Sequence, residues 1–268
     1  MNLLYIAEIV GKSGILCVKK LLPGIKRKYG IDFVVANANG ATGGNGLGKN
    51  HSGYLHKLGC NVLTGGNYIF SKKDLVDSLS SMPFVLRPQN FLPESPGNGY
   101  KIFKTPAGNV AVISLLGRSG FSNVHSGNPF LELERILPRI KETSKIVIVD
   151  FCGATTAEKR AFSTFADGKV SAVFGSGARV QTADGEIMPG GTASITDGGR
   201  TGIVNSVQGL NPVMKLAEFL SGVPRWNCEI NDLDNVLQEL QGVFVKINDC
   251  GKAEHLEPLK ISLEMKEE

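Results

Sequence analysis

Residues 171–184 read SAVFGSGARVQTAD, and this stretch places a loop directly after a predicted β-strand. The run 171–174 is short and apolar, which is typical of a strand buried on both faces. In open α/β proteins, ligands and catalytic groups gather in the loops that leave the C-terminal ends of strands. The loop after residue 174 contains small residues and Arg179 but no histidine. It therefore has the position of a functional loop without an obvious catalytic side chain.

Alternating strand and helix patterns extend from this stretch in both directions. Apolar runs predict strands at 3–10, 32–38, 61–66, 100–105, 108–116, 145–151, 171–174, 242–249 and 259–265, and residues 179–197 predict two more around a Gly-rich turn. Helices are predicted at 16–25, 71–79 and 130–140, from the Thr155/Glu158 capping box through Phe165, and from the cap Asn211 onward. We expect residues 1–268 to form one α/β domain, with a mixed sheet or two packed sheets.

The composition excludes several classes of protein. The chain has 268 residues, of which 42% are apolar and 20% charged, which is typical of a soluble globular protein. A net charge of +4 with dispersed Lys and Arg gives no strong signal for nucleic-acid binding. The basic cluster at 26–28 is interpreted as the solvated end of a helix, with an anion-binding patch as the alternative.

Targeting features also indicate a cytoplasmic location. No apolar run reaches the ~18 residues that a membrane helix needs, and the N-terminal residues lack the features of a signal peptide. The five cysteines form no CxxC pair, which favours reduced thiols over a disulfide framework.

Two glycine-rich stretches look like phosphate-binding loops but do not match them. The VGKSG stretch at 10–14 contains the GKS of a P-loop, yet Ile6 stands where the pattern requires a glycine. The stretch GGNGLGK at 43–49 is out of register with the dinucleotide-binding pattern G-x-G-x-x-G. We interpret the first as a strand-to-helix turn and the second as a loop at a strand end.

Small polar residues follow the end of each of five predicted strands. They occur at 8–11, 37–40, 66–68, 150–153 and 175–179. In two-metal phosphoesterases, such strand ends carry the ligands of two cations that lie about 3.5–4 Å apart.

A series of motifs then makes the chain similar to a known family. The motifs are IVGKSG (9–14), IDFVVANANGATGG (31–44), LTGGN (63–67), LRPQNF (86–91), PGNGY (96–100), VDFCGATTAEK (149–159) and VQTADGEIMPGGTASITDGGRTG (180–202). Together they resemble the YmdB-type branch of the calcineurin-like metallophosphoesterases, a family associated with 2′,3′-cyclic-nucleotide phosphodiesterase activity. The resemblance covers nearly the whole chain. It implies an αββα sandwich of two mixed sheets flanked by helices, and a homo-oligomer.

The chain departs from the family pattern at the positions that the resemblance assigns to metal ligands and catalysis. The family has an aspartate, a Glu-Asn pair, an Asn-His pair, the histidine of Asp-Phe-His and the two histidines of Thr-His-Thr-His. In this chain these positions hold Glu8, Asn39 and Gly40, Asn67 and Tyr68, Cys152, and Gly177 and Arg179. The 175–184 loop therefore resembles a metal-binding loop that has lost both histidines, which explains why it carries no obvious catalytic side chain.

The substitutions change the chemistry expected at these positions. Arg179 places a fixed positive charge where the family binds a dication, and Glu8 is one methylene longer than aspartate. The four histidines, at 51, 56, 125 and 255, all lie elsewhere in the chain. Tyr68 is a poor replacement for a histidine as general acid, since the unperturbed pKa of tyrosine is near 10. We therefore expect no metal cofactor and no hydrolysis of the family type.

Alternative roles remain for three of these residues. Cys152 is either a nucleophile or a small buried thiol that fills the space of a histidine. Tyr68 either stacks on a base or ribose, or plugs the pocket. Arg179 either holds a ligand phosphate or forms an internal ion pair with Glu8.

Three functions follow from these alternatives. The first is a catalytically inactive scaffold or regulatory subunit. The second is a module that binds a nucleotide or phosphate through Arg179. The third is a residual phosphodiesterase with one weakly bound metal. If the implied fold is correct, the strand ends that carry Glu8, Asn39, Asn67, Cys152 and Arg179 should meet at one edge of the sheets.

Overall fold

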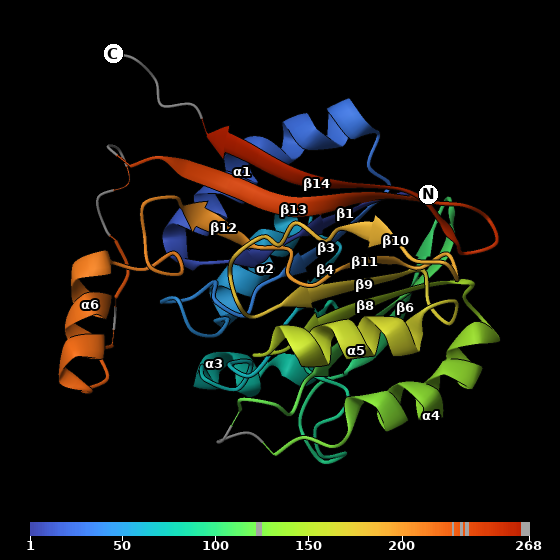
Figure 1. The fold of residues 1–268 in the computed structure, drawn as a ribbon, viewed down its shortest axis with the longest axis horizontal. Coiled ribbons are helices and arrows are strands. Elements are labelled where there is room, and N and C mark those ends of the chain that lie inside the picture. Colours follow the sequence, from blue (N-terminus) through green and yellow to red (C-terminus); the bar gives the residue numbers. More distant parts are fainter. Residues whose placement is uncertain (122–124, 227, 231–232, 234–235, 264–268) are drawn as a thin grey trace.

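Two β-sheets packed face to face form the centre of the computed structural model, which describes residues 1–121, 125–226, 228–230, 233 and 236–263 (Figure 1). The eight-stranded sheet has the order β2 (Glu8–Ile9), β12 (Arg200–Ile203), β13 (Gln238–Ile247), β1 (Asn2–Ile6), β3 (Phe33–Asn37), β4 (Val62–Thr64) and β5 (Val85–Leu86), with β14 (Ala253–Leu263) also paired to β13. The six-stranded sheet has the order β10 (Glu186–Ile187), β11 (Ala193–Ile195), β9 (Ala172–Ser176), β8 (Ile146–Cys152), β7 (Gly108–Leu116) and β6 (Tyr100–Thr105).

Both sheets are mixed. Strands β1, β3, β4 and β5 run parallel, and β13 joins β1 antiparallel. In the other sheet β7, β8, β9 and β11 run parallel, while β6 and β10 are antiparallel edges. The parallel strands therefore bring loops from distant parts of the sequence to the same end of the two sheets.

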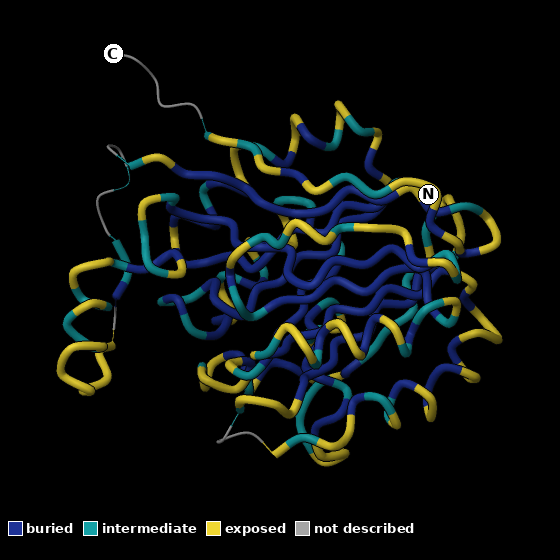
Figure 2. Tube along the Cα trace, in the orientation of Figure 1, coloured by how far each residue is buried: buried dark blue, intermediate teal, exposed yellow. Residues whose placement is uncertain are grey.

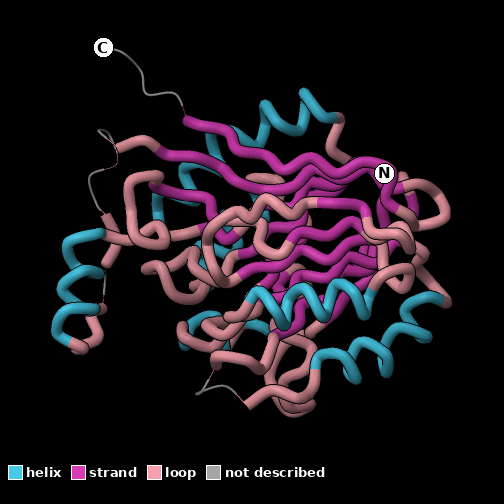
Figure 3. Tube along the Cα trace, in the orientation of Figure 1, coloured by secondary structure: helices cyan, strands magenta, loops and turns pink. Residues whose placement is uncertain are grey.

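Helices cover the outer faces of the sheets (Figure 3). The helices in the described residues are α1 (Gly11–Tyr29), α2 (Lys49–Lys57), α3 (Lys73–Val76), α4 (Pro129–Lys141), α5 (Thr156–Ala166) and α6 (Pro212–Ser221), with a short 3₁₀ turn at Leu79–Ser81. α1 packs on the eight-stranded sheet, and α4 and α5 pack on the six-stranded sheet. α6 stands at the side of the molecule, away from both sheets.

Alternating side chains build three apolar layers. On β1, Leu4 and Ile6 pack toward α1, whereas Leu3 and Tyr5 pack between the two sheets. β8 behaves in the same way, with alternate residues packing between the sheets and under α4 and α5. Burial of the central strands on both faces is visible in Figure 2 and explains their almost continuous apolar sequence.

The predicted αββα sandwich is therefore confirmed. Its extent as one domain over 1–268 stays a prediction. Among the described residues, no helix combines the length and apolar character needed to cross a membrane.

Several local predictions are corrected. The predicted strand that starts at 179 is limited to β10. Residues 179–184 form an irregular loop instead, in which the Gln181 side chain donates to the Gly242 carbonyl and the Asp184 side chain accepts from the Thr196 backbone N–H. The helix predicted at 71–79 is reduced to α3 and the 3₁₀ turn, and α2 was missed because its sequence has few apolar residues. The closing strand predicted at 259–265 is part of β14 up to residue 263, and residues 264–265 lie outside the described ones.

Helix caps were predicted more accurately. The Thr155 side chain accepts a hydrogen bond from the Glu158 backbone N–H, and Asn211 caps α6 in the same way. In a complete capping box the glutamate side chain would also accept from the backbone N–H of Thr155. Here the Glu158 carboxylate instead accepts from the backbone N–H groups of Arg118 and Ser119.

Candidate functional site

A buried ion pair joins two of the predicted site residues. Glu8 lies on β2 and Arg179 in the loop after β9, and Arg179 Nη2 is 2.7 Å from Glu8 Oε1. The same guanidinium donates to the carbonyls of Gly44 at 2.7 Å and Gln208 at 3.2 Å. Arg179 is only 4% exposed and Glu8 only 1%. The predicted internal pair is therefore confirmed. Arg179 also links its own loop to the segments that contain Gly44 and Gln208.

Electrostatics keep the Arg179 guanidinium charged despite its burial. Burial by itself lowers the pKa of Arg179, but the carboxylate of Glu8 outweighs that effect, so the pKa lies above its ordinary value. The guanidinium is thus a permanent cation at the carboxylate.

Gly40 provides the space for the guanidinium. A Cβ atom at this position would lie 2.8 Å from Arg179 Nη2 and 3.1 Å from Glu8 Oε1, so a larger residue would displace the pair. Arg179 itself adopts a φ of 60° and Gln208 a φ of 56°, a left-handed conformation that is uncommon outside glycine. The fold therefore holds Arg179 in place at some cost in backbone energy.

Asn39 is held by hydrogen bonds to the loop that follows β4. Its Oδ1 accepts from the backbone N–H groups of Gly66 at 2.8 Å and Tyr68 at 3.0 Å, and its Nδ2 donates to Asn67 Oδ1 at 3.0 Å. Cys152 Sγ lies 3.9 Å from the same Asn67 oxygen. Both amide side chains are thus engaged with protein groups.

Cys152 is an unreactive thiol in this environment. Burial first, and then the charges of Glu8 and Asp150, raise its pKa to about 12. The thiolate is the nucleophilic form of cysteine, and it is therefore scarce near neutral pH. This result favours the buried-thiol interpretation of Cys152 over the nucleophile.

The predicted residues surround one cleft of about 680 Å³. Six of the eight line it, namely Glu8, Asn39, Asn67, Tyr68, Gly177 and Arg179. The other two lie directly behind it, since Gly40 contacts the ion pair and Cys152 contacts Asn67. The strand ends therefore converge as expected. Tyr68 is 38% exposed at the cleft, so it does not fill it as a plug would.

The cleft also contains residues that the sequence patterns did not reveal. Lys72, Lys215, Arg225 and Trp226 line it, together with Phe121. Lys215 pairs with Glu218 at 2.8 Å, whereas Lys72 and Arg225 form no ion pair within the described ranges. The only signal in the sequence was the Lys215–Glu218 spacing of three on a predicted helix.

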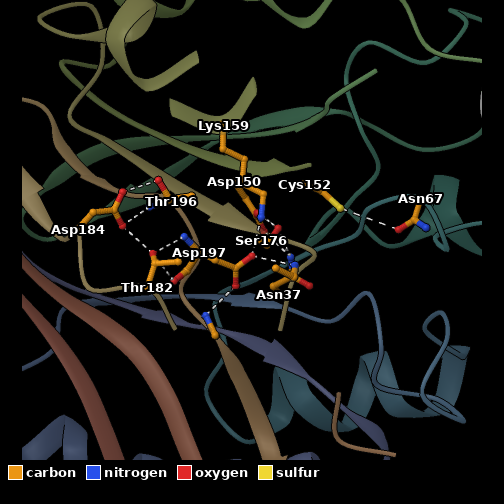
Figure 4. Close-up of polar contacts among 12 residues, drawn as sticks. Asn37, Asn67, Asp150, Cys152, Lys159, Ser176, Thr182, Asp184, Thr196 and Asp197 are labelled. Carbon is orange, nitrogen blue, oxygen red and sulfur yellow. Dashed lines mark hydrogen bonds and ion pairs between the residues drawn. The ribbon is translucent and has the colours of Figure 1, made fainter. Parts of the chain in front are cut away.

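A polar network behind the cleft links the two sheets (Figure 4). Asp150 on β8 accepts hydrogen bonds from Asn37 Nδ2 at 2.9 Å and Ser176 Oγ at 2.8 Å, and from the Thr64 hydroxyl. Burial raises the pKa of Asp150 to about 6, although these hydrogen bonds oppose the shift. The network fixes the ends of β3, β4, β8 and β9 relative to one another.

A second buried ion pair positions the loop that carries Arg179. Lys159 on α5 approaches Asp197 at 2.6 Å, and both side chains are at most 2% exposed. Asp197 also accepts from the backbone N–H groups of Ala178 at 2.8 Å and Gly199 at 2.9 Å. The pair therefore anchors the backbone directly before Arg179.

The four histidines take no part in this arrangement, since none lines the cleft. Across the part of the chain that the structure describes, no three His, Cys, Asp or Glu side chains are grouped so that they could hold a metal ion.

Comparisons with known proteins agree with the fold. A family model described as "YmdB-like protein" matches residues 4–259. A 2′,3′-cyclic-nucleotide 2′-phosphodiesterase from Bacillus subtilis is 34% identical over 224 residues, which cover 84% of each chain. A structure described as a novel phosphatase from Mycoplasma pneumoniae has a TM-score of 0.89 and 30% identity, and the match covers 98% of this chain and 93% of the other.

Two further structures extend the comparison. A hypothetical protein from Thermus thermophilus has a TM-score of 0.88 and 27% identity, with 98% and 99% of the two chains covered. A 5′-nucleotidase from Staphylococcus aureus, at 14% identity and a TM-score of 0.59 over 100% of this chain and 55% of that one, shares the fold alone. The two-sheet architecture and a family match over nearly the whole chain lead to one conclusion: this chain is a member of the YmdB-like family of metallophosphoesterase-related proteins.

Proposed function

We propose that this chain is a catalytically inactive member of its family that acts as a scaffold or regulatory subunit. The observation that carries the proposal is the 2.7 Å ion pair between Arg179 and Glu8. Glu8 is the one carboxylate among the eight positions that the resemblance assigns to the site. Its charge is neutralised by a permanent cation from the same chain, in place of a metal ion.

The residues present do not fit a pair of divalent cations. Asn39 Oδ1 already accepts two backbone hydrogen bonds, and Glu8 Oε1 accepts from Arg179. The raised pKa of Cys152 disfavours the thiolate that a metal would bind. Glu8 Oε2 is a buried oxygen without a hydrogen-bond partner among the described residues. This one oxygen, which lies beside a guanidinium, supplies far fewer ligand atoms than two metal ions require.

The scaffold part of the proposal is supported by the surface of the protein. Large apolar side chains on α6, including Leu216 and Phe219, are exposed to solvent. Large exposed apolar surfaces commonly mark sites where proteins interact.

The metal content and turnover of the protein test this proposal. We expect protein purified without chelators to contain well below two transition-metal ions per chain by elemental analysis. We also expect added Mn²⁺ to give no hydrolysis of 2′,3′-cyclic AMP above the protein-free rate, because Arg179 repels a dication at this position. The phosphodiesterase from Bacillus subtilis is the positive control.

The contrary outcome is a metal-dependent activity. Turnover that rises with added metal, and that is lost when Glu8 is changed to Gln, would show a residual phosphodiesterase with one weak metal. The Arg179→Gln variant serves as a comparison, since it removes the cation and should bind metal at least as well as the wild type.

A second candidate function is binding of a nucleotide or phosphate without cleavage. The cleft volume lies in the usual range for small-molecule sites, and Lys72, Arg225, Tyr68 and Trp226 supply cations and aromatic faces. Arg179 is a poor anchor for such a ligand, because its guanidinium is buried and already bonded to three acceptors. Binding would therefore depend on Lys72 and Arg225 instead.

Thermal stability in the presence of a ligand tests this candidate. If a nucleoside 3′-monophosphate binds, a concentration of 100 times Kd stabilises the native state by about 2.7 kcal/mol and raises Tm by several degrees. The shift should disappear in the Lys72→Gln, Arg225→Gln double variant. It should persist in Lys104→Gln, because Lys104 lines a different hollow. No shift in the wild type at millimolar ligand would exclude the candidate.

A further inference from the structure

The glycine-rich loop at 43–46 brings unpaired backbone donors to the cleft, which Gly43 and Asn45 line. Gly43, Gly44 and Gly46 have φ angles of 70°, 79° and 92°, a left-handed conformation that glycine adopts without strain. The backbone N–H groups of Gly43, Gly44 and Asn45 have no hydrogen-bond acceptor among the described residues, although Gly44 is buried. Successive N–H groups in turns of this kind form concavities that bind anions.

Lys72 adds a positive charge beside these donors. A Cβ atom at Gly43 would lie 3.6 Å from Lys72 Nζ, and one at Gly46 would lie 3.5 Å from Lys72 Cγ, so the lysine side chain extends along the loop. The Cβ atom at Gly46 would also lie 2.9 Å from the Tyr68 carbonyl oxygen and 3.1 Å from Ser71 Cβ. The loop therefore packs directly against the 68–72 segment, and this packing holds the ammonium group next to the unpaired N–H groups.

The charges of the cleft favour an anion at this position. The charged side chains that line it are four cations and two carboxylates, which gives a formal charge of +2. Both carboxylates are paired with cations of the cleft, so the unpaired charge belongs to Lys72 and Arg225. At the former metal position an anion would meet the carboxylate of Glu8, whose Oε2 has no hydrogen-bond partner among the described residues. A phosphate is therefore expected at the 43–46 loop and not where the family binds metal.

An apolar hollow of about 350 Å³ adjoins the cleft beside Lys72. It shares Asn67 and Ser71 with the cleft, and Ser71 directly precedes the lysine. Phe70 and Phe91 line the hollow with ring centroids 5.4 Å apart, and Phe70 is 37% exposed. Aromatic side chains of this kind are the surfaces on which nucleobases stack. A ligand that carries a phosphate at one end and a base at the other matches both neighbouring sites.

We propose that the 43–46 loop and Lys72 bind the phosphate of a nucleoside monophosphate whose base lies in the hollow of Phe70 and Phe91. This inference rests on the second candidate function and specifies where its ligand binds. The phosphate oxygens accept hydrogen bonds from the unpaired N–H groups and from the Lys72 ammonium, and such charge-assisted bonds are the strong ones. The site requires neither a metal ion nor cleavage, and the ion pair of Glu8 and Arg179 stays intact when the ligand binds.

Isothermal titration calorimetry with adenosine 3′-monophosphate tests the proposal. We expect the full-length wild type to bind this nucleotide more tightly than it binds inorganic phosphate or adenosine. Lys72→Gln should weaken nucleotide binding about 10- to 100-fold, because it removes a charge-assisted hydrogen bond. Lys72→Arg should restore most of the affinity, since it keeps the charge. Lys73→Gln is the matched control, because Lys73 is exposed and does not line the cleft, and it should bind like the wild type.

Two further variants test the loop and the hollow separately. Gly43→Ala should weaken binding, because the new methyl group strains a positive φ and lies beside Lys72 Nζ. Gly108→Ala is its control, since Gly108 also has a positive φ, of 109°, and a Cβ atom there would meet nothing within 4 Å. Phe70→Ala should weaken nucleotide binding about 5-fold or more through lost stacking. Tyr54→Ala is the control for this change, because Tyr54 is a similarly exposed aromatic residue, at 39%, outside the cleft and the hollow.

The outcomes separate this site from the question of catalysis. All titrations contain EDTA, so binding that depends on Lys72 supports the site whether or not the protein hydrolyses 2′,3′-cyclic AMP when Mn²⁺ is added. That hydrolysis would contradict only the proposed inactivity. No binding to the wild type at millimolar nucleotide would overturn the inference. Binding that is unchanged in Lys72→Gln would also overturn it, because the phosphate would then lie elsewhere. Circular dichroism of each variant checks that the fold is retained.

Discussion

Changing Glu8 to Gln will lower the free energy of unfolding by about 3–5 kcal/mol, and changing Arg179 to Gln will have an effect of similar size. Each change leaves one buried charge without its partner, and that unpaired charge is the main source of the cost. The Arg179→Gln change also removes the hydrogen bonds that the guanidinium donates to the Gly44 and Gln208 carbonyls. Urea denaturation near neutral pH measures both effects.

The double variant distinguishes an ion pair from two independent contacts. Removal of both charges should lower the free energy of unfolding by less than the sum of the two single changes, with a coupling energy of about 2–3 kcal/mol. The exposed pair of Arg160 and Glu186 is the control, because its side chains are 46% and 43% exposed. Its coupling should be below about 1 kcal/mol. A coupling near zero for Glu8 and Arg179 would show that their contact does not stabilise the fold.

Changing Lys159 to Met will also destabilise the protein by about 3–5 kcal/mol near neutral pH. Asp197 would then be a buried carboxylate with only two backbone N–H donors, from Ala178 and Gly199. Lys169→Met is the matched control, since Lys169 meets Glu134 at 3.5 Å with both side chains well exposed. The control should change the unfolding free energy by less than about 1 kcal/mol.

The pH dependence of the Lys159→Met penalty gives an independent check. Burial already raises the pKa of Asp197, and Lys159 is the strongest influence that opposes this shift. Without Lys159 the folded-state pKa rises further above the unfolded value, so the native state of the variant gains relative stability as pH falls through that pKa. The penalty should therefore shrink between about pH 7.5 and about pH 4.5. A penalty that is constant with pH would show that lost packing, and not the unpaired carboxylate, dominates.

Local signals in the sequence predicted the strands and helices of an α/β domain, whereas the choice of two packed sheets over one mixed sheet came from the resemblance to the family. Continuous apolar runs such as 145–151 predicted strands buried on both faces, and β8 has alternate residues in two apolar layers. The helix caps at Thr155 and Asn211 could also be predicted from the sequence, since a cap depends only on the residues within one turn. Short elements were less predictable. β10 has two residues, and its place depends on pairing with β11.

The sequence also determined which residues meet at the cleft, once the order of the strands was inferred from the family pattern. It indicated that Glu8 and Arg179 compensate each other in charge, and the 2.7 Å contact between them follows from that compensation. It gave no indication that Gly40 makes room for the guanidinium, because this depends on a distance between loops that are far apart in the sequence.

Only the tertiary structure decided what lies around that pair. Lys159 looks like an ordinary surface residue of an amphipathic helix, yet packing of α5 places it against Asp197 in the interior. Lys72 and Arg225 carry no motif, and the cleft alone brings them together. The apolar residues of α6 would be assigned to a core by periodicity, but the ion pair of Lys215 and Glu218 faces the cleft and turns them outward. Sequence patterns report which side chains avoid water, whereas the direction in which a helix faces depends on contacts with the rest of the chain.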